Sequence, residues 1–203
     1  LPPGQDCGVF DVQRGSQEWA DVEKHINSHG FGATVSKVQR VQHMLRWEKF
    51  AFQRNLMARE LSGGGGVGGG GGDVSRAANE LWLKHGTGGR NGGTASVVVA
   101  TSDTGIDPMY CDRGMYGRGS YFAEEADYSH TGYVYDAADG AKEILLVRVL
   151  AGKEDVRTAA DTSIRTPNPG CHSVKGPVRG SQQAYIVYEP HRSYPEYIVT
   201  YKK

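Results

Sequence analysis

The hydrophobic pattern of this 203-residue chain changes at one place, a run of nine glycines within Ser62–Asp73. Before the run, apolar residues recur at helical spacing, and after it they gather in short runs between turn residues. This change predicts an α+β domain, with helices first and a mostly antiparallel sheet after them. The run at 62–73 predicts a flexible surface loop, because long surface loops cost little to close. A phosphate cradle is disfavoured, because no Lys-Ser/Thr pair follows the glycines.

Two helices and one strand are expected before the glycine run. The first helix follows Ser16, which can cap it, and extends to Ile26. Thr34–Val41 is rich in β-branched residues and predicts a strand. The apolar spacing over 42–59 predicts the second helix.

The segment after the glycine run favours a sheet. Short apolar or β-rich runs separated by turn residues predict its strands: Leu81–His85, Val97–Val99, the end of Gly117–Ala123, Lys142–Leu150, Ala184–Tyr188 and Tyr197–Tyr201. A further helix is expected within Glu124–Tyr135, with a break near Gly132.

Charge and cysteine usage exclude several classes of function. Lys plus Arg equals 23 and Asp plus Glu equals 23, so electrostatics argues against binding of nucleic acid or of an anionic membrane as the main activity. The longest apolar runs are about four residues, far short of the ~20 that a membrane span needs. Three cysteines provide neither a disulfide framework nor a Cys-rich zinc site. We therefore expect no metal, no signal peptide and an intracellular location, nuclear or cytoplasmic.

Three clusters carry residues suited to chemistry. They are His85-Gly86-Thr87, Gly117–Phe122 and Tyr128–Tyr133. Each alone has an ordinary structural explanation, since histidines at strand ends and aromatics beside glycines commonly serve packing. Together they supply aromatic faces, hydroxyls and exposed backbone amides, which a flat heteroaromatic ligand requires.

The same clusters resemble a known family. Four segments are similar in order and spacing to motifs of the catalytic domain of poly(ADP-ribose) polymerases: Leu83–Thr87, Gly117–Ala123, Tyr185–Tyr188 and Tyr194–Tyr201. The stretches 38–42 and 46–50 are similar to that family's first strand and helix. The ending Tyr-Pro-Glu-Tyr is shared with the mono-ADP-ribosylating branch and the tankyrases. The resemblance implies one catalytic domain over residues 1–203, with an NAD-binding cleft on a split antiparallel sheet.

At the nicotinamide end of NAD, the resemblance implies four contacts. Gly86 would hold the amide group with its backbone N–H and C=O. Tyr121 and Tyr133 would stack on the two sides of the ring, with Tyr135 as an alternative to Tyr133. Ser129 would donate a hydrogen bond to the amide oxygen.

At the other end of NAD, the resemblance implies that His85 hydrogen-bonds a hydroxyl of the adenine ribose. Thr87 and Arg90 are expected near the adenosine and the phosphates. No metal is implied, and NAD serves as a co-substrate.

One position departs from the polymerases. They complete a His-Tyr-Glu triad, with His85 and Tyr121 as the first two positions here, but the third position is Ala184. A glutamate there can bind ribose hydroxyls and activate an acceptor, which alanine cannot do. Glu189 and Glu196 are the nearby carboxylates, and neither has the right position on the strand.

The resemblance implies an NAD-dependent protein ADP-ribosyltransferase, a pentosyltransferase that releases nicotinamide. The missing glutamate favours transfer of single ADP-ribose units to protein acceptors, among which the domain itself is a candidate. The alternatives are a module that binds NAD or ADP-ribose with little turnover, and a scaffold that recruits partners.

Overall fold

The computed structural model describes residues 1–203 except 3, 64–72, 89–92 and 112–113. The glycine run predicted to form a loop therefore lies, apart from its ends, outside the described residues. Arg90 also lies outside them. Within the described part, no helix combines the length and the apolar character that a membrane crossing requires.

One sheet forms the centre of the described fold. Its strands run in the order β1-β2-β10-β6-β3-β4-β9-β8-β7, and β5 pairs with β6. Every neighbouring pair is antiparallel except β7 with β8. The strands are β1 (Cys7–Asp11), β2 (Thr34–His43), β3 (Glu80–His85), β4 (Ser120–Ala123), β5 (Tyr135–Asp136), β6 (Lys142–Leu150), β7 (Glu154–Val156), β8 (Ser173–Arg179), β9 (Gln182–Val187) and β10 (Ser193–Lys202). The predicted α+β class with a mostly antiparallel sheet is confirmed.

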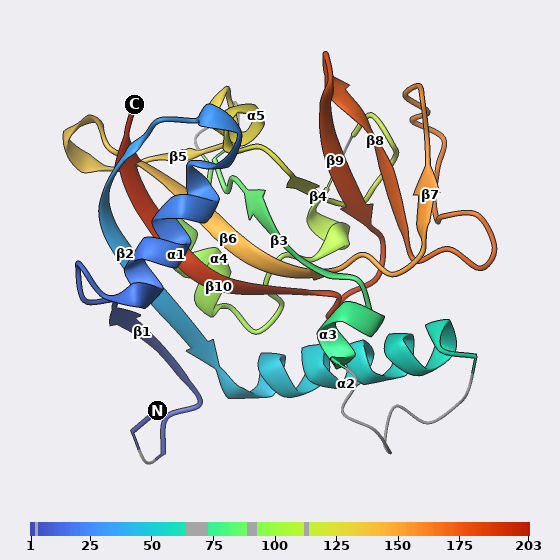
Figure 1. The fold of residues 1–203 in the computed structure, drawn as a ribbon, viewed down its shortest axis with the longest axis horizontal. Helices are drawn as coiled ribbons and strands as arrows, with labels where there is room; N and C mark the ends of the chain where they lie inside the picture. The colour runs from blue at the N-terminus through green and yellow to red at the C-terminus, as the bar shows by residue number, and fades with distance from the viewer. Residues whose placement is uncertain (3, 64–72, 89–92, 112–113) are drawn as a thin grey trace.

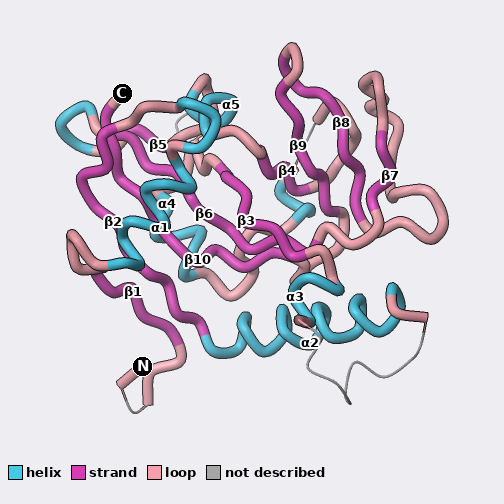
Figure 2. The backbone as a smooth tube through the Cα atoms, in the orientation of Figure 1, coloured by secondary structure: helices cyan, strands magenta, loops and turns pink. Residues whose placement is uncertain are grey.

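The sheet consists of two halves that meet at β3 and β4. Along β3 and β6 all six residues of β3 are in register, whereas β3 and β4 share the single pair Lys84 and Ala123. Figure 2 shows β9, β8 and β7 standing apart from β3, β6 and β10. The sheet therefore opens just beyond Lys84, where the first sequence cluster begins.

Helices cover both faces of the larger half. They are α1 (Gln17–Ile26), α2 (Met44–Leu61), α3 (Val74–Ala77), α4 (Ser96–Thr101) and α5 (Ala126–His130), with 3-10 turns at Ser28–Gly30, Pro108–Tyr110 and Ala138–Gly140. Residues of β6 alternate between the faces: Ile144 and Leu146 pack in the cluster that contains α1, and Leu145 packs with Ala100 of α4. Ser16 caps α1 as predicted, accepting from the Trp19 N–H at 3.2 Å.

Three expectations about the secondary structure need correction. Val97–Val99 lies in the helix α4 and not in a strand. The helix expected over Glu124–Tyr135 is confined to Ala126–His130, although the chain turns at Gly132 as predicted, with a φ of 110°. The strands β1, β5, β7 and β8 were not predicted, because short, polar or Gly/Pro-containing segments have weak strand propensity. Pairing with neighbouring strands decided their conformation.

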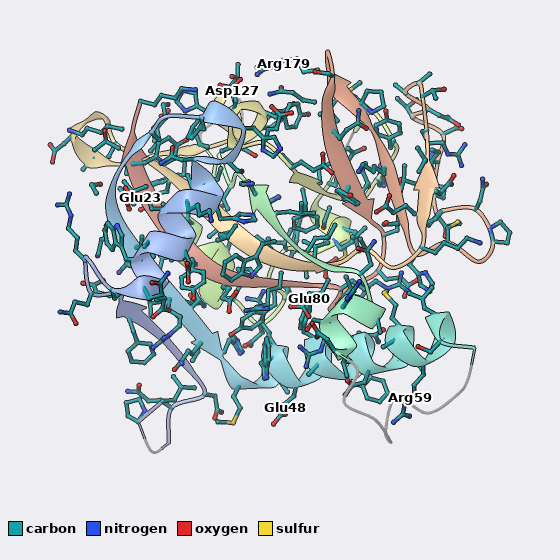
Figure 3. The ribbon with its side chains drawn as sticks, viewed as in Figure 1. Glu23, Glu48, Arg59, Glu80, Asp127 and Arg179 are labelled. Carbon is teal, nitrogen blue, oxygen red and sulfur yellow. The ribbon has the colours of Figure 1, made fainter. Side chains whose placement is uncertain are left out.

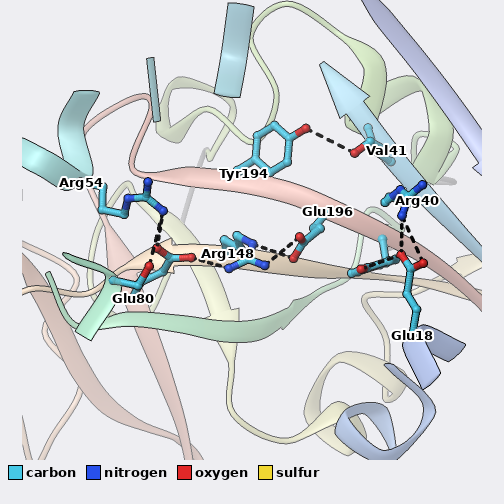
Figure 4. A network of polar contacts seen from close by, with 10 residues as sticks. Glu18, Arg40, Val41, Arg54, Glu80, Arg148, Tyr194 and Glu196 are labelled. Carbon is cyan, nitrogen blue, oxygen red and sulfur yellow. Dashed lines mark hydrogen bonds and ion pairs between the residues drawn. The ribbon is translucent and has the colours of Figure 1, made fainter. Parts of the chain in front are cut away.

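A polar network lies at the start of β3, between β3, β6, β10 and α2 (Figure 4). Glu80 binds Arg148 at 2.7 Å and Arg54 at 3.4 Å, and Arg148 binds Glu196 at 2.7 Å. The Glu80 side chain is only 3% exposed, so these cations keep a carboxylate stable in the interior. Glu196 therefore has a structural role in the sheet, and it does not line the cavity described below.

Candidate active site

A cavity of about 660 Å³ lies where β3 and β4 separate. One side, which we term the strand wall, comes from the ends of β3 and β4 and from the α5 region: His85, Gly86, Thr87, Gly119, Ser120, Tyr121, Ala123, Tyr128, Ser129 and Tyr133. The opposite side, the loop wall, comes from the chain between β3 and β4: Thr94, Val98, Val99, Ser102, Thr104, Gly105, Ile106, Asp107, Tyr110, Cys111, Gly114 and Met115. The cavity brings together six residues predicted from the sequence: His85, Gly86, Thr87, Tyr121, Ser129 and Tyr133.

His85 bridges the gap at which the two halves of the sheet part. Its Nδ1 lies 2.8 Å from the carbonyl oxygen of Tyr121, which can only accept, so Nδ1 carries the proton. Burial lowers the pKa of His85 below its ordinary value. The ring is therefore neutral near pH 7, and its Nε2 is a hydrogen-bond acceptor.

The ring of Tyr121 is fixed by its own hydroxyl. That oxygen accepts from the Tyr116 N–H at 2.8 Å and donates to the Gly117 carbonyl at 2.9 Å. Burial raises the pKa of Tyr121 far above its ordinary value, so the phenol stays neutral. Because β4 fixes the backbone and these two hydrogen bonds fix the hydroxyl, the ring of Tyr121 gives the cavity a rigid aromatic surface.

Gly86 lies against the backbone that carries Tyr133. A Cβ on Gly86 would stand 2.2 Å from the Tyr133 carbonyl oxygen, so only glycine permits this contact. The absent side chain thus makes room for the backbone of Tyr133. The Tyr133 ring lies 5.2 Å from the ring of Tyr128, and Tyr135 belongs to β5 outside the cavity lining.

Ser129 and Thr87 complete the predicted part of the strand wall. Ser129 is 3% exposed and sits on α5. That helix is tied to β8 by the ion pair of Asp127 with Arg179, which Figure 3 labels side by side. Thr87 Oγ1 lies 3.2 Å from Ser96 Oγ of α4, so it connects the two walls.

Ala184 is not part of the cavity lining. It is fully buried and packs in an apolar cluster with Tyr116, Ile164, Val174 and Ile186. Its register partner across β4 and β9 is Ala123, which does line the cavity. Ala184 therefore lies directly beside the cavity floor, one strand away from it.

The carboxylates near Ala184 in the sequence do not replace the missing glutamate. Glu189 has a 59% exposed side chain and pairs with Arg192 at 2.8 Å. Glu196 is held by Arg148 in the buried network. Among the described residues that line the cavity, Asp107 on the loop wall carries the one carboxylate.

Sequence reasoning missed the loop wall and the position of Tyr128 inside the cavity. One local signal was present: Asp107 precedes Pro108, and its Oδ1 caps the following turn by accepting from the Met109 N–H at 2.8 Å. The apolar run in α4 was misleading, since Val98 and Val99 line the cavity and do not form a strand.

The cavity fits a ligand that is flat and neutral at one end. Its volume lies within the ~300–1,000 Å³ typical of small-molecule sites, and its described lining is aromatic, hydroxylic and weakly charged. A neutral imidazole acceptor and a fixed phenol ring stand at adjoining positions. These residues suit the aromatic amide and the ribose hydroxyls of NAD.

Comparisons with known proteins identify the family of this chain. A profile of the poly(ADP-ribose) polymerase catalytic domain matches residues 16–183. The human protein mono-ADP-ribosyltransferase PARP12 is 31% identical over 180 residues, which is 82% of this chain and 22% of that protein. A probable poly [ADP-ribose] polymerase of Dictyostelium discoideum is 27% identical over 201 residues, 96% of this chain and 52% of that protein. The chain spans only part of each relative, and it belongs to the poly(ADP-ribose) polymerase catalytic-domain family.

Proposed function

We propose that this domain transfers single ADP-ribose units from NAD to protein acceptors and releases nicotinamide. The observation that carries the proposal is a strand wall in which His85 is bonded to the backbone of Tyr121. Ala184, at the position for which the resemblance implies a glutamate in the polymerases, lies one strand away from it. The names of its relatives, mono-ADP-ribosyltransferases from human and mouse, support the same reaction.

The strand wall would hold the nicotinamide end of NAD. Tyr121 and Tyr133 provide ring faces, with Tyr128 supporting the second of them. The Gly86 backbone and the Ser129 hydroxyl offer donors and an acceptor for a primary amide. These contacts hold the ring and its amide in one orientation.

The His85 Nε2 would accept a hydrogen bond from a hydroxyl of the adenine ribose, because Nδ1 is already committed to Tyr121. Thr87 stands next to it, and Arg90 remains a proposed contact for the phosphates on the sequence argument alone. Fixing both ends of NAD exposes the bond between nicotinamide and ribose to an acceptor.

In the reaction, the bond from the ribose carbon to the nicotinamide nitrogen breaks, and nicotinamide leaves as a neutral molecule. A nucleophile of the acceptor protein forms the new bond to the same carbon. An acceptor carboxylate is already ionised, so it needs no base for the attack. A ribose hydroxyl must lose a proton to serve as the next acceptor, and a carboxylate at position 184 is missing. The product therefore stops at one unit.

Incubation with labelled NAD and an acidic protein acceptor tests the proposal. We expect nicotinamide release that depends on the acceptor, and a single labelled adduct per site on a denaturing gel. Ladders of longer products would overturn single-unit transfer. NAD binding without acceptor-dependent release would overturn the enzymatic function and leave a binding module. An intracellular location, nuclear or cytoplasmic, belongs to the same proposal.

A further inference from the structure

Arg46 of α2 is a buried cation whose hydrogen-bond partners lie at the loop wall. It is only 5% exposed, and its Nη1 donates to the carbonyl oxygens of Ala100 at 2.8 Å and Ser102 at 3.2 Å. Both carbonyls stand at the end of α4, where the last carbonyls of a helix lack partners within it. A cation at this end is also favoured by the helix dipole. Arg46 thus joins α2 to a helix more than fifty residues further along the chain.

The chain then bends around this guanidinium group at Gly105. Gly105 has a φ of 66°, and a Cβ there would stand 2.1 Å from Nη2 of Arg46. Glycine is the residue that tolerates both the left-handed backbone and this contact. The Ser102 hydroxyl closes the bend by accepting from the Gly105 N–H at 3.0 Å.

Other contacts hold the guanidinium in place. Its carbon lies 5.9 Å from the centre of the Tyr194 ring. A separate contact links the start of α2 to the same bend: Nε2 of His43, the residue before α2, lies 3.4 Å from Oδ1 of Asp103. The Nη2 of Arg46 is buried and has no hydrogen-bond partner among the described residues. Burying a cation with an unused donor costs free energy, so stability alone is a poor reason for this arrangement.

The segment that Arg46 holds is part of the loop wall. Ser102, Gly105 and Asp107 all line the cavity. The other side-chain bonds to this bend are long: the hydroxyls of Ser120 and Ser193 lie 3.4 and 3.5 Å from the Ile106 carbonyl. Among the described residues, the two hydrogen bonds from Nη1 of Arg46 are therefore the shortest that a side chain of the scaffold makes to this segment.

We propose that Arg46 is a positioning residue, which sets the distance between the loop wall and the strand wall and so controls binding of the ADP-ribose part of NAD. The inference rests on the proposed function. The proposed nicotinamide contacts and the ribose contact of His85 belong to the strand wall, which Arg46 does not touch. The rest of ADP-ribose extends beyond these contacts across the cavity to the loop wall, so this part of the ligand depends on Arg46. Loss of Arg46 should therefore lower the affinity for ADP-ribose and leave the affinity for a nicotinamide mimic nearly unchanged. A general loss of folding would lower both affinities together.

Binding of two probes to the full chain tests this inference: ADP-ribose, and benzamide as a mimic of nicotinamide. Arg46→Met keeps an unbranched apolar stem and removes both hydrogen bonds. Arg46→Lys keeps a cation that can donate to the same carbonyls, and Gly105→Ala displaces the guanidinium from the other side. Arg54→Met is the matched control, since Arg54 lies on the same helix and pairs with the buried Glu80 away from the cavity.

We expect Arg46→Met and Gly105→Ala to weaken ADP-ribose binding by about tenfold or more. A displacement of the loop wall by about 1 Å is enough for an effect of this size. Benzamide affinity should change by less than about threefold, Arg46→Lys should recover part of the loss, and Arg54→Met should bind both probes like wild type. Equal losses for both probes, or unchanged ADP-ribose binding in the folded variants, would overturn the inference. If Arg46→Met fails to fold, Arg46→Lys and Gly105→Ala decide. A wild-type chain that binds neither probe would instead overturn the proposed function.

Discussion

The two walls of the cavity are built in different ways. The strand wall is placed by backbone pairing, since β3 is in register with β6 over its whole length and β4 with β9. Where the two halves meet, side chains of β3 add hydrogen bonds to the β4 segment, from His85 to the Tyr121 carbonyl and from Lys84 to the Glu124 carbonyl. The loop wall consists of a six-residue helix, a 3-10 turn and bends, and its position depends on side chains of other elements, with Arg46 foremost.

This difference teaches where rigidity and adaptability reside. Ladder hydrogen bonds and core packing make the strand wall costly to open, whereas a short helix held by a few side-chain bonds opens at a lower free energy. Chemistry that needs fixed geometry belongs on the first kind of wall, and ligand entry on the second. The following substitutions test that division, in order of decreasing effect.

His85→Ala should have the largest effect. It removes the acceptor for the ribose hydroxyl and also one of the side-chain hydrogen bonds between the two halves of the sheet. We expect kcat/KM for nicotinamide release to fall by about 10²–10³-fold, because a displaced reacting carbon adds to the lost hydrogen bond. His25→Ala is the control, since its Nε2 lies 2.8 Å from a carbonyl of the same strand, Trp82, outside the cavity. Equal losses in the two variants would assign His85 a structural role.

Ala184→Glu tests whether a side chain at position 184 faces the apolar cluster or the cavity. The new carboxylate enters the apolar cluster around Ala184 and should cost about 2–3 kcal/mol, roughly 5–10 °C in Tm. Ala184→Leu serves as the control for added volume without charge. An unchanged Tm for the glutamate variant would mean that the carboxylate reaches the cavity beside Ala123, and a rise in transfer would confirm that position as part of the wall.

Tyr133→Ala should weaken benzamide binding by about tenfold to a hundredfold, because stacking on one aromatic ring contributes ~1–3 kcal/mol. Tyr135→Ala, two residues further on in β5, should leave the affinity unchanged. Titration calorimetry of both variants measures the difference. Similar affinities in the two would remove Tyr133 from the nicotinamide site.

Acid should imitate the loss of His85 reversibly. Protonation removes the acceptor at Nε2, and burial places the pKa of His85 below its ordinary value of 6.5. ADP-ribose affinity should therefore stay level as the pH falls to about 6.5 and decline only below it, by about tenfold per unit once the proton competes fully. His85→Gln, which does not titrate in this range, should show no such decline. A loss that starts above pH 6.5 would contradict a neutral buried imidazole.

Asp107→Ala should have the smallest effect. It removes the cap of a single turn in the loop wall, which contributes about 1 kcal/mol or less to stability. We expect ADP-ribose affinity to fall by less than about fivefold. Asp161→Ala is closely matched, since Asp161 accepts from the N–H two residues ahead, at 2.9 Å, outside the cavity. If Asp107→Ala had an effect as large as His85→Ala, the loop wall would carry chemistry, and the division between the walls would fail.

The sequence predicted the strand wall well because local residue patterns specify the segments that form this wall. A run of apolar residues predicted β6 to its terminal residues, and the motif around His85 lies where β3 ends. Clusters near Tyr121 and Ser129 also led to the cavity. Residue types and spacing suffice when each segment has a strong strand or helix preference of its own.

The remaining parts were decided by contacts between distant segments. Val97–Val99 has strand propensity, yet it is helical where the guanidinium of Arg46 meets the end of α4. The family resemblance identified Ala184 as the position that lacks the glutamate, but only the packing of β9 against Tyr116 shows that it is buried behind the cavity floor. The sequence by itself determined the family, the fold class and the strand wall. The tertiary structure decided the loop wall, because short segments with weak propensity adopt the conformation that their distant partners stabilise.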